Sequence, residues 1–366
     1  MAEELVTDSV KDYYGKVLSK TDDLKTNACV SIEGSAKIAK HIRKAIAQVH
    51  DEVVIKYYGC GLCIPTTLED MSILDLGSGS GRDCYILSKL VGKNGHVVGI
   101  DMTDEQLEVA NKYIDYHREK FGFAKSNVEF VKGYIEKLGE AGLKDNTFDI
   151  IVSNCVINLS PDKHAVIAEA YRVLKEGGEL YFSDVYADRE LSDDIRKHKV
   201  LWGECIAGAL YWKDFVDISK KVGFSRPRLV EAGIIEVTKP ELKEVLGDAK
   251  FVSVTYRMFK LPKTEKPASQ VIYEGNIEDS EKEFKLDYNH IFCAGDVVSV
   301  DSDISTILQC SRLADEFTFQ PSAVKGGASC SPKEEDIVDP FEYLAKGGPS
   351  KGACCAPSDN SKGGCC

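Results

Sequence analysis

Four cysteines, Cys29, Cys60, Cys155 and Cys205, lie around a glycine-rich run in the sequence, Asp75-Leu-Gly-Ser-Gly-Ser-Gly81. A run of this type is suited to holding a nucleotide-like cofactor against the backbone. Thiolates are soft ligands, and they prefer soft metals and metalloids to hard cations. The combination predicts a cofactor cleft beside a site for a substrate that binds sulfur.

The glycine run lies between a predicted strand and a predicted helix, where its three glycines would let the chain turn tightly. The nicotinamide fingerprint needs its third glycine one position later, and Arg82 stands there. The G-x-G-x-G spacing, with Asp75 two residues before it, resembles the first motif of class I S-adenosylmethionine-dependent methyltransferases. Asp101 ends the second predicted strand, and it is placed to accept hydrogen bonds from both ribose hydroxyls of such a cofactor.

Two later segments would complete this cleft, because ligands of open α/β sheets bind at the carboxyl ends of the strands. Ile135 could pack on an adenine ring, although a role in the core would explain it equally well, and Glu136 could read the amino group. Ser153-Asn-Cys-Val156 follows the fourth predicted strand, beside the expected place of the transferable methyl. The complete set of predicted cofactor-binding residues is Tyr58, Gly59, Asp75, Gly77, Ser78, Gly79, Gly81, Arg82, Asp101, Met102, Ile135, Glu136, Asn154 and Val156.

Each of the four cysteines taken singly would be explained by burial in the core, where free cysteine is common. Their joint placement favours a substrate site: Cys155 follows a strand at the cleft, and Cys205 is expected within a helix that can roof it. Cys29 and Cys60 precede the first strand and could close over the cofactor. Cys60 and Cys63 have C-x-x-C spacing, but neither a second pair nor a His pair completes a zinc site, and no strand clearly leads in as in a redox motif.

The composition limits the classes of function. At 366 residues, with 43% hydrophobic and 29% charged residues, the chain can bury a substantial core. The net charge of -13 argues against a nucleic-acid partner. The sequence shows no membrane-length apolar stretch and an acidic N-terminus, so we expect no membrane association. Thirteen cysteines without an export signal predict a reducing, cytoplasmic location.

The elements that must position these groups alternate between short β runs and helices. Strands are expected at 73–76, 97–101, 128–132, 148–153, 180–184 and 251–261, and helices at 10–18, 38–49 and 190–222. Such alternation predicts a parallel sheet covered by helices on both faces. The expected fold is therefore α/β, a Rossmann-like doubly wound sheet of the class I methyltransferase type.

The composition of the sequence changes after Pro262. Residues 263–269 have the composition of a linker, and 270–320 carry β runs between Gly and Asp turns, which predicts a small mixed or β-rich domain. The Cys-containing segment from about Lys325 is rich in Gly, Ser, Lys and Pro and is expected to be disordered. We predict a helical cap at 1–70, a cofactor-binding core at 71–262, a small C-terminal domain at 263–324 and a Cys-rich tail at 325–366.

Four segments together resemble the arsenite methyltransferase family of the animal type. They are Tyr57-Tyr-Gly-Cys-Gly61, Asp75-Leu-Gly-Ser-Gly-Ser-Gly-Arg-Asp83, Ser153-Asn-Cys-Val-Ile-Asn-Leu159 and Trp202-Gly-Glu-Cys205. The resemblance runs from about residue 10 to about residue 345. It implies an enzyme that methylates trivalent arsenic, arsenite and then methylarsonite, with S-adenosylmethionine. The arsenicals would arrive free or as glutathione conjugates, and glutathione or thioredoxin would serve as reductant.

The resemblance also implies catalytic roles for the four cysteines. Cys155 and Cys205 would hold arsenic in every round, Cys60 would be the third As(III) ligand in the first methylation, and Cys29 would assist capture or a disulfide. Three thiolates leave the arsenic lone pair opposite them, so that arsenic itself can attack the sulfonium methyl and no general base is needed. The transfer oxidises arsenic, and two enzyme cysteines would reduce it again by forming a disulfide.

Two other functions stay open at this point. A methyltransferase for a small organic acceptor would leave the cysteines dispensable, and a non-enzymatic thiol-rich arsenic- or metal-binding protein would leave Asp101 and the glycine run unexplained. Glu204 could hydrogen-bond a departing arsenic hydroxyl, but a surface position is the expectation. The pairs Cys354-Cys355 and Cys365-Cys366 are expected to be non-essential thiols, so truncation after Gly326 should spare activity.

Overall fold

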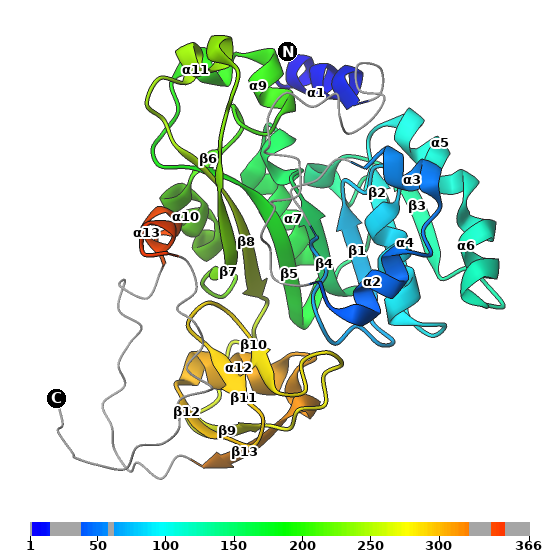
Figure 1. Ribbon diagram of the computed structural model, residues 1–366, viewed down its shortest axis with the longest axis vertical. Coiled ribbons are helices and arrows are strands. Elements are labelled where there is room, and N and C mark those ends of the chain that lie inside the picture. Colours follow the sequence, from blue (N-terminus) through cyan, green and yellow to red (C-terminus); the bar gives the residue numbers. More distant parts are fainter. Residues whose placement is uncertain (1, 15–37, 58–61, 322–337, 348–366) are drawn as a thin grey trace.

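The computed structural model describes residues 2–14, 38–57, 62–321 and 338–347 (Figure 1). Its main sheet has eight strands in the order β3-β2-β1-β4-β5-β8-β7, with β6 paired to β5. β8 runs antiparallel to β5 and β7, whereas the other neighbours are parallel. The strands are β1 (Ser72–Leu76), β2 (His96–Asp101), β3 (Val128–Lys132), β4 (Phe148–Asn154), β5 (Leu174–Ala187), β6 (Leu210–Tyr211), β7 (Arg228–Ile235) and β8 (Phe251–Phe259). The predicted α/β fold class and its strands are confirmed.

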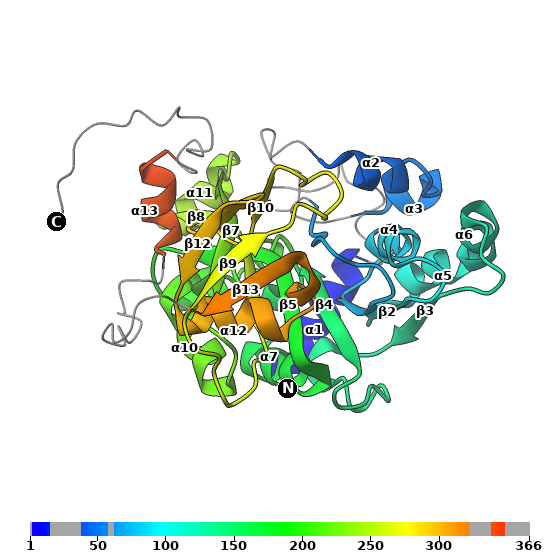
Figure 2. The same cartoon turned by 90° about the horizontal axis from the view of Figure 1, so that it is seen from below.

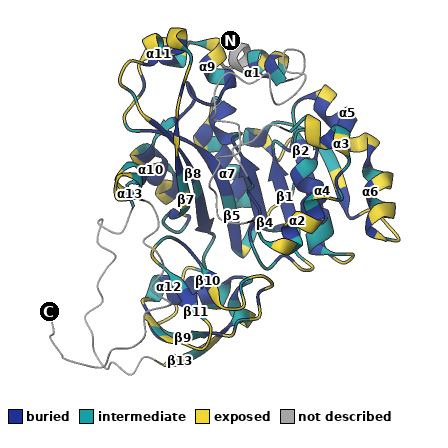
Figure 3. Cartoon of the chain, in the orientation of Figure 1, coloured by how far each residue is buried: buried dark blue, intermediate teal, exposed yellow. Residues whose placement is uncertain are grey.

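The central strands are apolar on both faces because helices cover both. In β1, Leu74 and Leu76 belong to one core cluster and Ile73 to another, as the alternation of side chains along a strand requires. One face carries α2 (Lys40–Ile46), α3 (Asp51–Ile55), α4 (Arg82–Val91), α5 (Asp104–Lys112) and α6 (Ile114–Phe121), and the other carries α7 (Lys163–Val173) and α10 (Trp212–Val222). Figure 3 shows the buried residues concentrated along the sheet and on the inner sides of these helices.

The segment 190–222, which was expected to be helical, is helical only in part. It contains α8 (Asp193–Arg196), α9 (Lys199–Gly203), the short β6 and then α10. The chain leaves the helical conformation after Glu204, because Cys205 has a left-handed backbone with φ +61°. The predicted helix at 38–49 is confirmed over α2. At the N-terminus, α1 spans Ala2–Asp12, and the rest of the predicted 10–18 helix beyond Tyr14 lies outside the described residues.

The β-rich C-terminal region is confirmed as a second, separate core. Phe259, Tyr273, Phe292 and Phe317 are among its buried members. Its elements are β9 (Ser269–Tyr273), β10 (Glu283–Lys285), β11 (Ile291–Cys293), β12 (Val297–Val300), α12 (Ser302–Cys310) and β13 (Phe317–Pro321), with β9 between β12 and β13. This region lies at the end of the main sheet opposite to α1 (Figure 1).

Buried charges join the C-terminal region to the main sheet. Glu179 on β5 is fully buried, and it accepts hydrogen bonds from Arg257 at 2.6 Å and from Arg312. Arg312 also donates to the carbonyl oxygens of Thr66 and Thr67, at 3.0 and 3.1 Å. Viewed from this end, α2 approaches the loop between β9 and β10 (Figure 2), where His41 Nδ1 lies 2.7 Å from Asp279.

Part of the predicted disordered tail is ordered. Asp339 caps α13 (Pro340–Ala345), and Tyr343, which is 4% exposed, packs into the core of the main sheet. The expectation of disorder was wrong here because Phe341, Tyr343 and Leu344 supply an apolar helix face. The four cysteines of the two C-terminal pairs lie outside the described residues. None of the helices within the described ranges is both long and apolar enough to span a bilayer.

Candidate functional site

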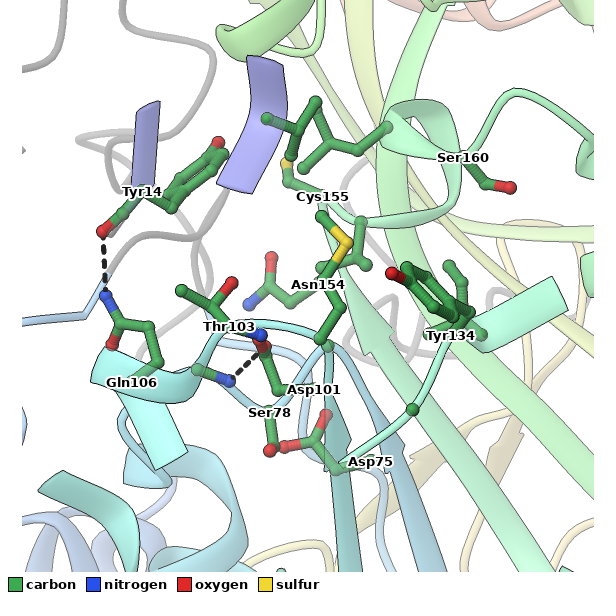
Figure 4. A pocket seen from close by; sticks show the side chains of 18 of the residues that line it. Tyr14, Asp75, Ser78, Asp101, Thr103, Gln106, Tyr134, Asn154, Cys155 and Ser160 are labelled. Carbon is green, nitrogen blue, oxygen red and sulfur yellow. Dashed lines mark hydrogen bonds between the residues drawn. The ribbon is translucent and has the colours of Figure 1, made fainter. Parts of the chain in front are cut away.

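A pocket opens at the carboxyl ends of β1, β2 and β4 (Figure 4). Its empty space is about 970 Å³, a volume that includes open solvent at its mouth. The lining comes from the glycine turn after β1, the ends of β2 and β4, the turn that follows β3, and α1. This is the edge at which open α/β sheets bind their ligands.

The glycine turn packs directly against the loop that carries Cys155. Gly77 and Ser78 donate their backbone N–H groups to the carbonyl oxygen of Ile100, at 2.8 and 3.0 Å. Gly77 has φ +69°, and a Cβ atom there would lie 2.4 Å from a methyl carbon of Val156. A Cβ atom on Gly79 would meet only the side-chain oxygen of Gln106, at 3.9 Å. The turn therefore needs Gly77 for its own packing, and Gly79 leaves open space on the pocket side.

Three carboxylates line the pocket: those of Asp75 and Asp83, which are buried, and that of Asp101, which is half-buried. Burial, and then the neighbouring Asp83, raises the pKa of Asp75 well above its usual range. Burial also raises the pKa of Asp83, against the opposing effect of Arg82, whose Nη1 lies 3.2 Å from its carboxylate. Removing carboxylates from water is costly, and a bound cation would reduce this cost. The site is suited to a ligand that carries positive charge.

The carboxylate of Asp101 binds two backbone N–H groups and can still accept further hydrogen bonds. One oxygen accepts the N–H of Gly79 at 2.9 Å, and the other accepts the N–H of Thr103 at 2.8 Å. Burial raises the pKa of Asp101, and these two N–H groups oppose the shift. Each carboxylate oxygen offers more than one lone pair, so both can also accept a ligand hydroxyl.

Two buried polar atoms in the pocket lack a partner among the described residues. They are Ser78 Oγ and Gln106 Oε1, on residues 9% and 5% exposed. Such groups are normally hydrogen-bonded, and unpaired ones need an explanation. Together with the three carboxylates and the open side of Gly79, they fit a polar, cationic, nucleoside-like cofactor.

The structure brings most of the predicted cofactor-binding residues to this pocket. Those that line it are Asp75, Gly77, Ser78, Gly79, Asp101, Met102, Ile135, Glu136, Asn154 and Val156. Gly81 instead caps α4, with φ +85°, and Arg82 stacks its guanidinium 3.9 Å from the centre of the Tyr57 ring. Neither of these two lines the pocket, and Tyr58 and Gly59 lie outside the described residues.

The sequence patterns did not indicate several polar residues that line the pocket. These are Tyr14, Tyr57, Asp83, Thr103, Gln106, Tyr134 and Ser160. Four of them, Tyr57, Asp83, Thr103 and Tyr134, are sequence neighbours of selected residues, and a wider window around each motif would have found them. Gln106 lies one helical turn beyond Thr103, on the side of α5 that faces the pocket. No sequence signal indicated Tyr14, which reaches the site from the segment that follows α1.

Cys155 and Cys205 meet at the pocket, although 50 residues separate them. Cys155 follows β4, lines the pocket and donates its backbone N–H to the carbonyl oxygen of Ser183 at 2.8 Å. The Cys205 thiol donates to the carbonyl oxygen of Cys155 at 2.9 Å. Both residues have left-handed backbones, with φ +55° and +61°. Cys155 is disulfide-bonded, whereas Cys205 keeps its thiol.

The left-handed conformation of Cys205 comes from the way α9 ends. Cys205 N–H donates to Trp202 O at 3.0 Å, and Ile206 N–H donates to Leu201 O at 2.9 Å. This is the Schellman pattern, in which the left-handed position is usually glycine. Leu201 and Ile206 are fully buried and supply its apolar contact. Cys205 is therefore not inside a helix, as expected, but at the fixed turn that closes one.

The other residues considered from the sequence lie elsewhere. Glu204 is fully buried rather than on the surface, and it accepts a hydrogen bond from the Tyr13 hydroxyl. Cys63 is buried and donates its thiol to Tyr181 O at 3.5 Å, and burial raises its pKa well above the usual range. Cys29 and Cys60 lie outside the described residues.

Comparisons with known proteins agree along the whole chain. The family described as Methyltransferase domain matches residues 68–223, and the family described as Arsenite methyltransferase C-terminal domain matches residues 266–366. The arsenite methyltransferase of Homo sapiens is 54% identical over 362 residues, which cover 98% of this chain and 95% of that protein. The arsenite methyltransferase of Aquipseudomonas alcaligenes is 52% identical over 316 residues, 85% of this chain and 90% of that protein.

A solved structure is also similar over most of its length. It is the crystal structure of CrArsM, an arsenic (III) S-adenosylmethionine methyltransferase from Chlamydomonas reinhardtii. The TM-score is 0.75 at 46% identity, and the match covers 79% of this chain and 98% of that one. On these matches and the methyltransferase fold of its sheet, the chain belongs to the arsenite methyltransferase family.

Proposed function

We propose that this chain methylates trivalent arsenic, first arsenite and then methylarsonite, with arsenic held by cysteine thiolates. The observation that carries the proposal is the meeting of Cys205 with Cys155, at 2.9 Å from thiol to carbonyl oxygen, beside the cofactor pocket. Soft thiolate ligands suit trivalent arsenic. A substrate bound by these two sulfurs would lie at the edge of the pocket that holds the methyl donor.

The cofactor is S-adenosylmethionine, which supplies an electrophilic methyl group on a positively charged sulfur when it is bound. The carboxylates of Asp75 and Asp83 would complement its positive charges. Asp101 would accept hydrogen bonds from the ribose hydroxyls, in addition to the two backbone N–H groups it already accepts. Ile135 and Glu136 would contact the base, and Gly79 would allow close approach of the ligand to the backbone.

The protein would contribute positioning and exclusion of water, since arsenic itself is the nucleophile through the lone pair opposite its thiolates. Cys155, Cys205 and Cys60 would be the three ligands in the first methylation, and Cys29 would assist capture. Leu159, Leu201 and Ile206 belong to the apolar cluster that contains Cys155 and Cys205. A fixed, dry site of this kind can lower a barrier by several kcal/mol through orientation alone.

The chemistry also requires a reductant. Methyl transfer forms an As–C bond, breaks the S–CH₃ bond and takes arsenic formally from +3 to +5. Two thiols would return two electrons to arsenic and form a disulfide, which an external thiol such as glutathione or thioredoxin would reopen. The disulfide at Cys155 supports a thiol–disulfide cycle at this site. We place the enzyme in the cytoplasm, where such thiols are supplied.

The proposal is tested by methyl transfer from S-adenosylmethionine to As(III) with reduced protein and glutathione. Cys155→Ser and Cys205→Ser should abolish all transfer, whereas Cys60→Ser and Cys29→Ser should lose the first methylation and keep some turnover of methylarsonite. Cys310→Ser is the matched control, because Cys310 is a free thiol on α12, in the separate C-terminal core region. Full activity of Cys155→Ser would contradict arsenic ligation by this residue.

A further inference from the structure

Helix α1 touches both halves of the site. It begins at Ala2, and Tyr13 and Tyr14 follow its last residue, Asp12. Figure 1 shows it at the end of the molecule where the parallel strands of the sheet finish, next to α9. Val10 is 2% exposed and belongs to the same apolar cluster as Cys155 and Cys205.

On the arsenic side, two tyrosines of this segment hold the residues immediately before Cys205. The Tyr13 hydroxyl donates to the buried carboxylate of Glu204, and the Tyr14 hydroxyl donates to the carbonyl oxygen of Gly203 at 2.8 Å. A Cβ atom on Gly203 would lie 2.8 Å from the Tyr13 ring, so the ring and the backbone are in close contact. The end of α9 is thus fixed against α1 by two hydrogen bonds and by packing.

On the cofactor side, the same segment contacts two residues that line the pocket. Gln106 donates its amide to the carbonyl oxygen of Tyr14 at 3.3 Å, a contact visible in Figure 4. Lys11 Nζ donates to the Tyr134 hydroxyl at 2.7 Å. Val10 and Tyr14 also line the pocket themselves. A ligand that fills the pocket therefore lies against α1 as well as against the sheet.

We propose that Tyr13 and Tyr14 are positioning residues that couple cofactor binding to arsenic binding through α1. The inference rests on the proposed function, since it takes Cys205 as an arsenic ligand. A bound cofactor adds contacts to the pocket side of α1 and stabilises the helix in this position. In this position the segment holds Gly203 and Glu204, and through them the turn that presents the Cys205 thiol. By linkage, bound arsenic must strengthen cofactor binding by the same factor.

The experiment measures the dissociation constant of As(III) for the reduced full chain, with and without saturating S-adenosylhomocysteine. This product lacks the methyl group, so no turnover occurs. In the wild type we expect As(III) to bind roughly tenfold more tightly when S-adenosylhomocysteine is present, within the usual range for coupled sites. In the double variant Tyr13→Phe, Tyr14→Phe the factor should fall to about two or less, and each single variant should lie between.

Tyr116→Phe is the control, because Tyr116 is a 39% exposed tyrosine on α6. It should keep the full coupling factor. If the two tyrosines had a merely structural role, their replacement would weaken As(III) binding equally with and without S-adenosylhomocysteine, and the ratio of the two dissociation constants would be unchanged. Melting temperatures report any loss of folding. The single variants serve if the double variant melts early.

The proposal would be overturned if the wild type showed no coupling, or if the double variant or both single variants kept it. Cys205→Ser separates this result from failure of the proposed function. If arsenic binding survives in Cys205→Ser with unchanged affinity, the ligand assignment fails. If binding is lost there but coupling persists without the tyrosine hydroxyls, only the role of α1 fails.

Discussion

Gly77 offers a sharp test of how the glycine turn builds the pocket. In Gly77→Ala the new Cβ atom would lie 2.4 and 2.5 Å from the two methyl carbons of Val156. The left-handed backbone, with φ +69°, adds a cost of about 1–2 kcal/mol for a residue with a Cβ atom. Overpacking of this kind costs about 1–3 kcal/mol. We expect Gly77→Ala to lower the free energy of unfolding by about 2–5 kcal/mol.

Gly79→Ala is the matched control. Its φ is +52°, so the backbone cost is similar, but the nearest atom to its Cβ is Gln106 Oε1 at 3.9 Å. Stability should fall by only about 1–2 kcal/mol, while the methyl group occupies space on the pocket side. Binding of S-adenosylhomocysteine should weaken by about tenfold or more in Gly79→Ala, a loss of at least ~1.4 kcal/mol.

Urea denaturation and titration with S-adenosylhomocysteine measure these two effects. A third variant completes a cycle: Val156→Ala removes the two closest methyl groups and leaves Val156 Cβ 2.9 Å from the added atom. The double variant Gly77→Ala, Val156→Ala should therefore be more stable than the sum of the single changes by about 1 kcal/mol or more. Equal destabilisation by Gly77→Ala and Gly79→Ala, or simple additivity in the cycle, would refute the close-contact explanation.

Three further predictions concern the framework of the site. Burial lowers the pKa of His117 to about 4, so the unfolded chain binds more protons than the folded chain between pH 6.5 and 4. The free energy of unfolding should therefore fall by about 3 kcal/mol as the pH drops through this range. Denaturation measured across this pH range should show that His117→Phe removes this contribution. Arg312→Met deprives the buried Glu179 of one partner and should cost about 3–5 kcal/mol in urea denaturation, whereas a change below 1 kcal/mol would show that Arg257 alone satisfies it. Truncation after Gly347 should spare both methyl transfer and stability. Truncation after Gly326 removes α13 and should lower the free energy of unfolding by about 2–4 kcal/mol, so equal melting temperatures of the two truncated proteins would contradict the packing role of α13.

The sheet could be predicted because its signals are local. Each strand is a short apolar run bounded by turn residues, and the cofactor residues that follow β1, β2 and β4 are placed by topology once the order of strands is known. Asp101 is the clearest case: its position at the end of a strand was enough to bring it to the pocket.

The rest depends on contacts between distant segments or on special backbone geometry. Tyr13 and Glu204 are 191 positions apart, and nothing in either local sequence indicates that they form a buried pair. The expected helix around Cys205 was wrong because a left-handed residue at a helix end is normally glycine, and here it is cysteine. The α13 helix was missed because it is a short apolar segment inside a region whose overall composition is typical of disorder.

Arsenic ligation by Cys155 and Cys205 is the central claim, and X-ray absorption at the arsenic edge measures it most directly. The reduced protein would be loaded with one equivalent of As(III), and the sulfur and oxygen neighbours of arsenic would be counted in the wild type and in Cys205→Ser. We expect three sulfur neighbours in the wild type, and two sulfurs with one oxygen in Cys205→Ser. The same sulfur count in both proteins would show that arsenic is held by other thiols and would contradict the account.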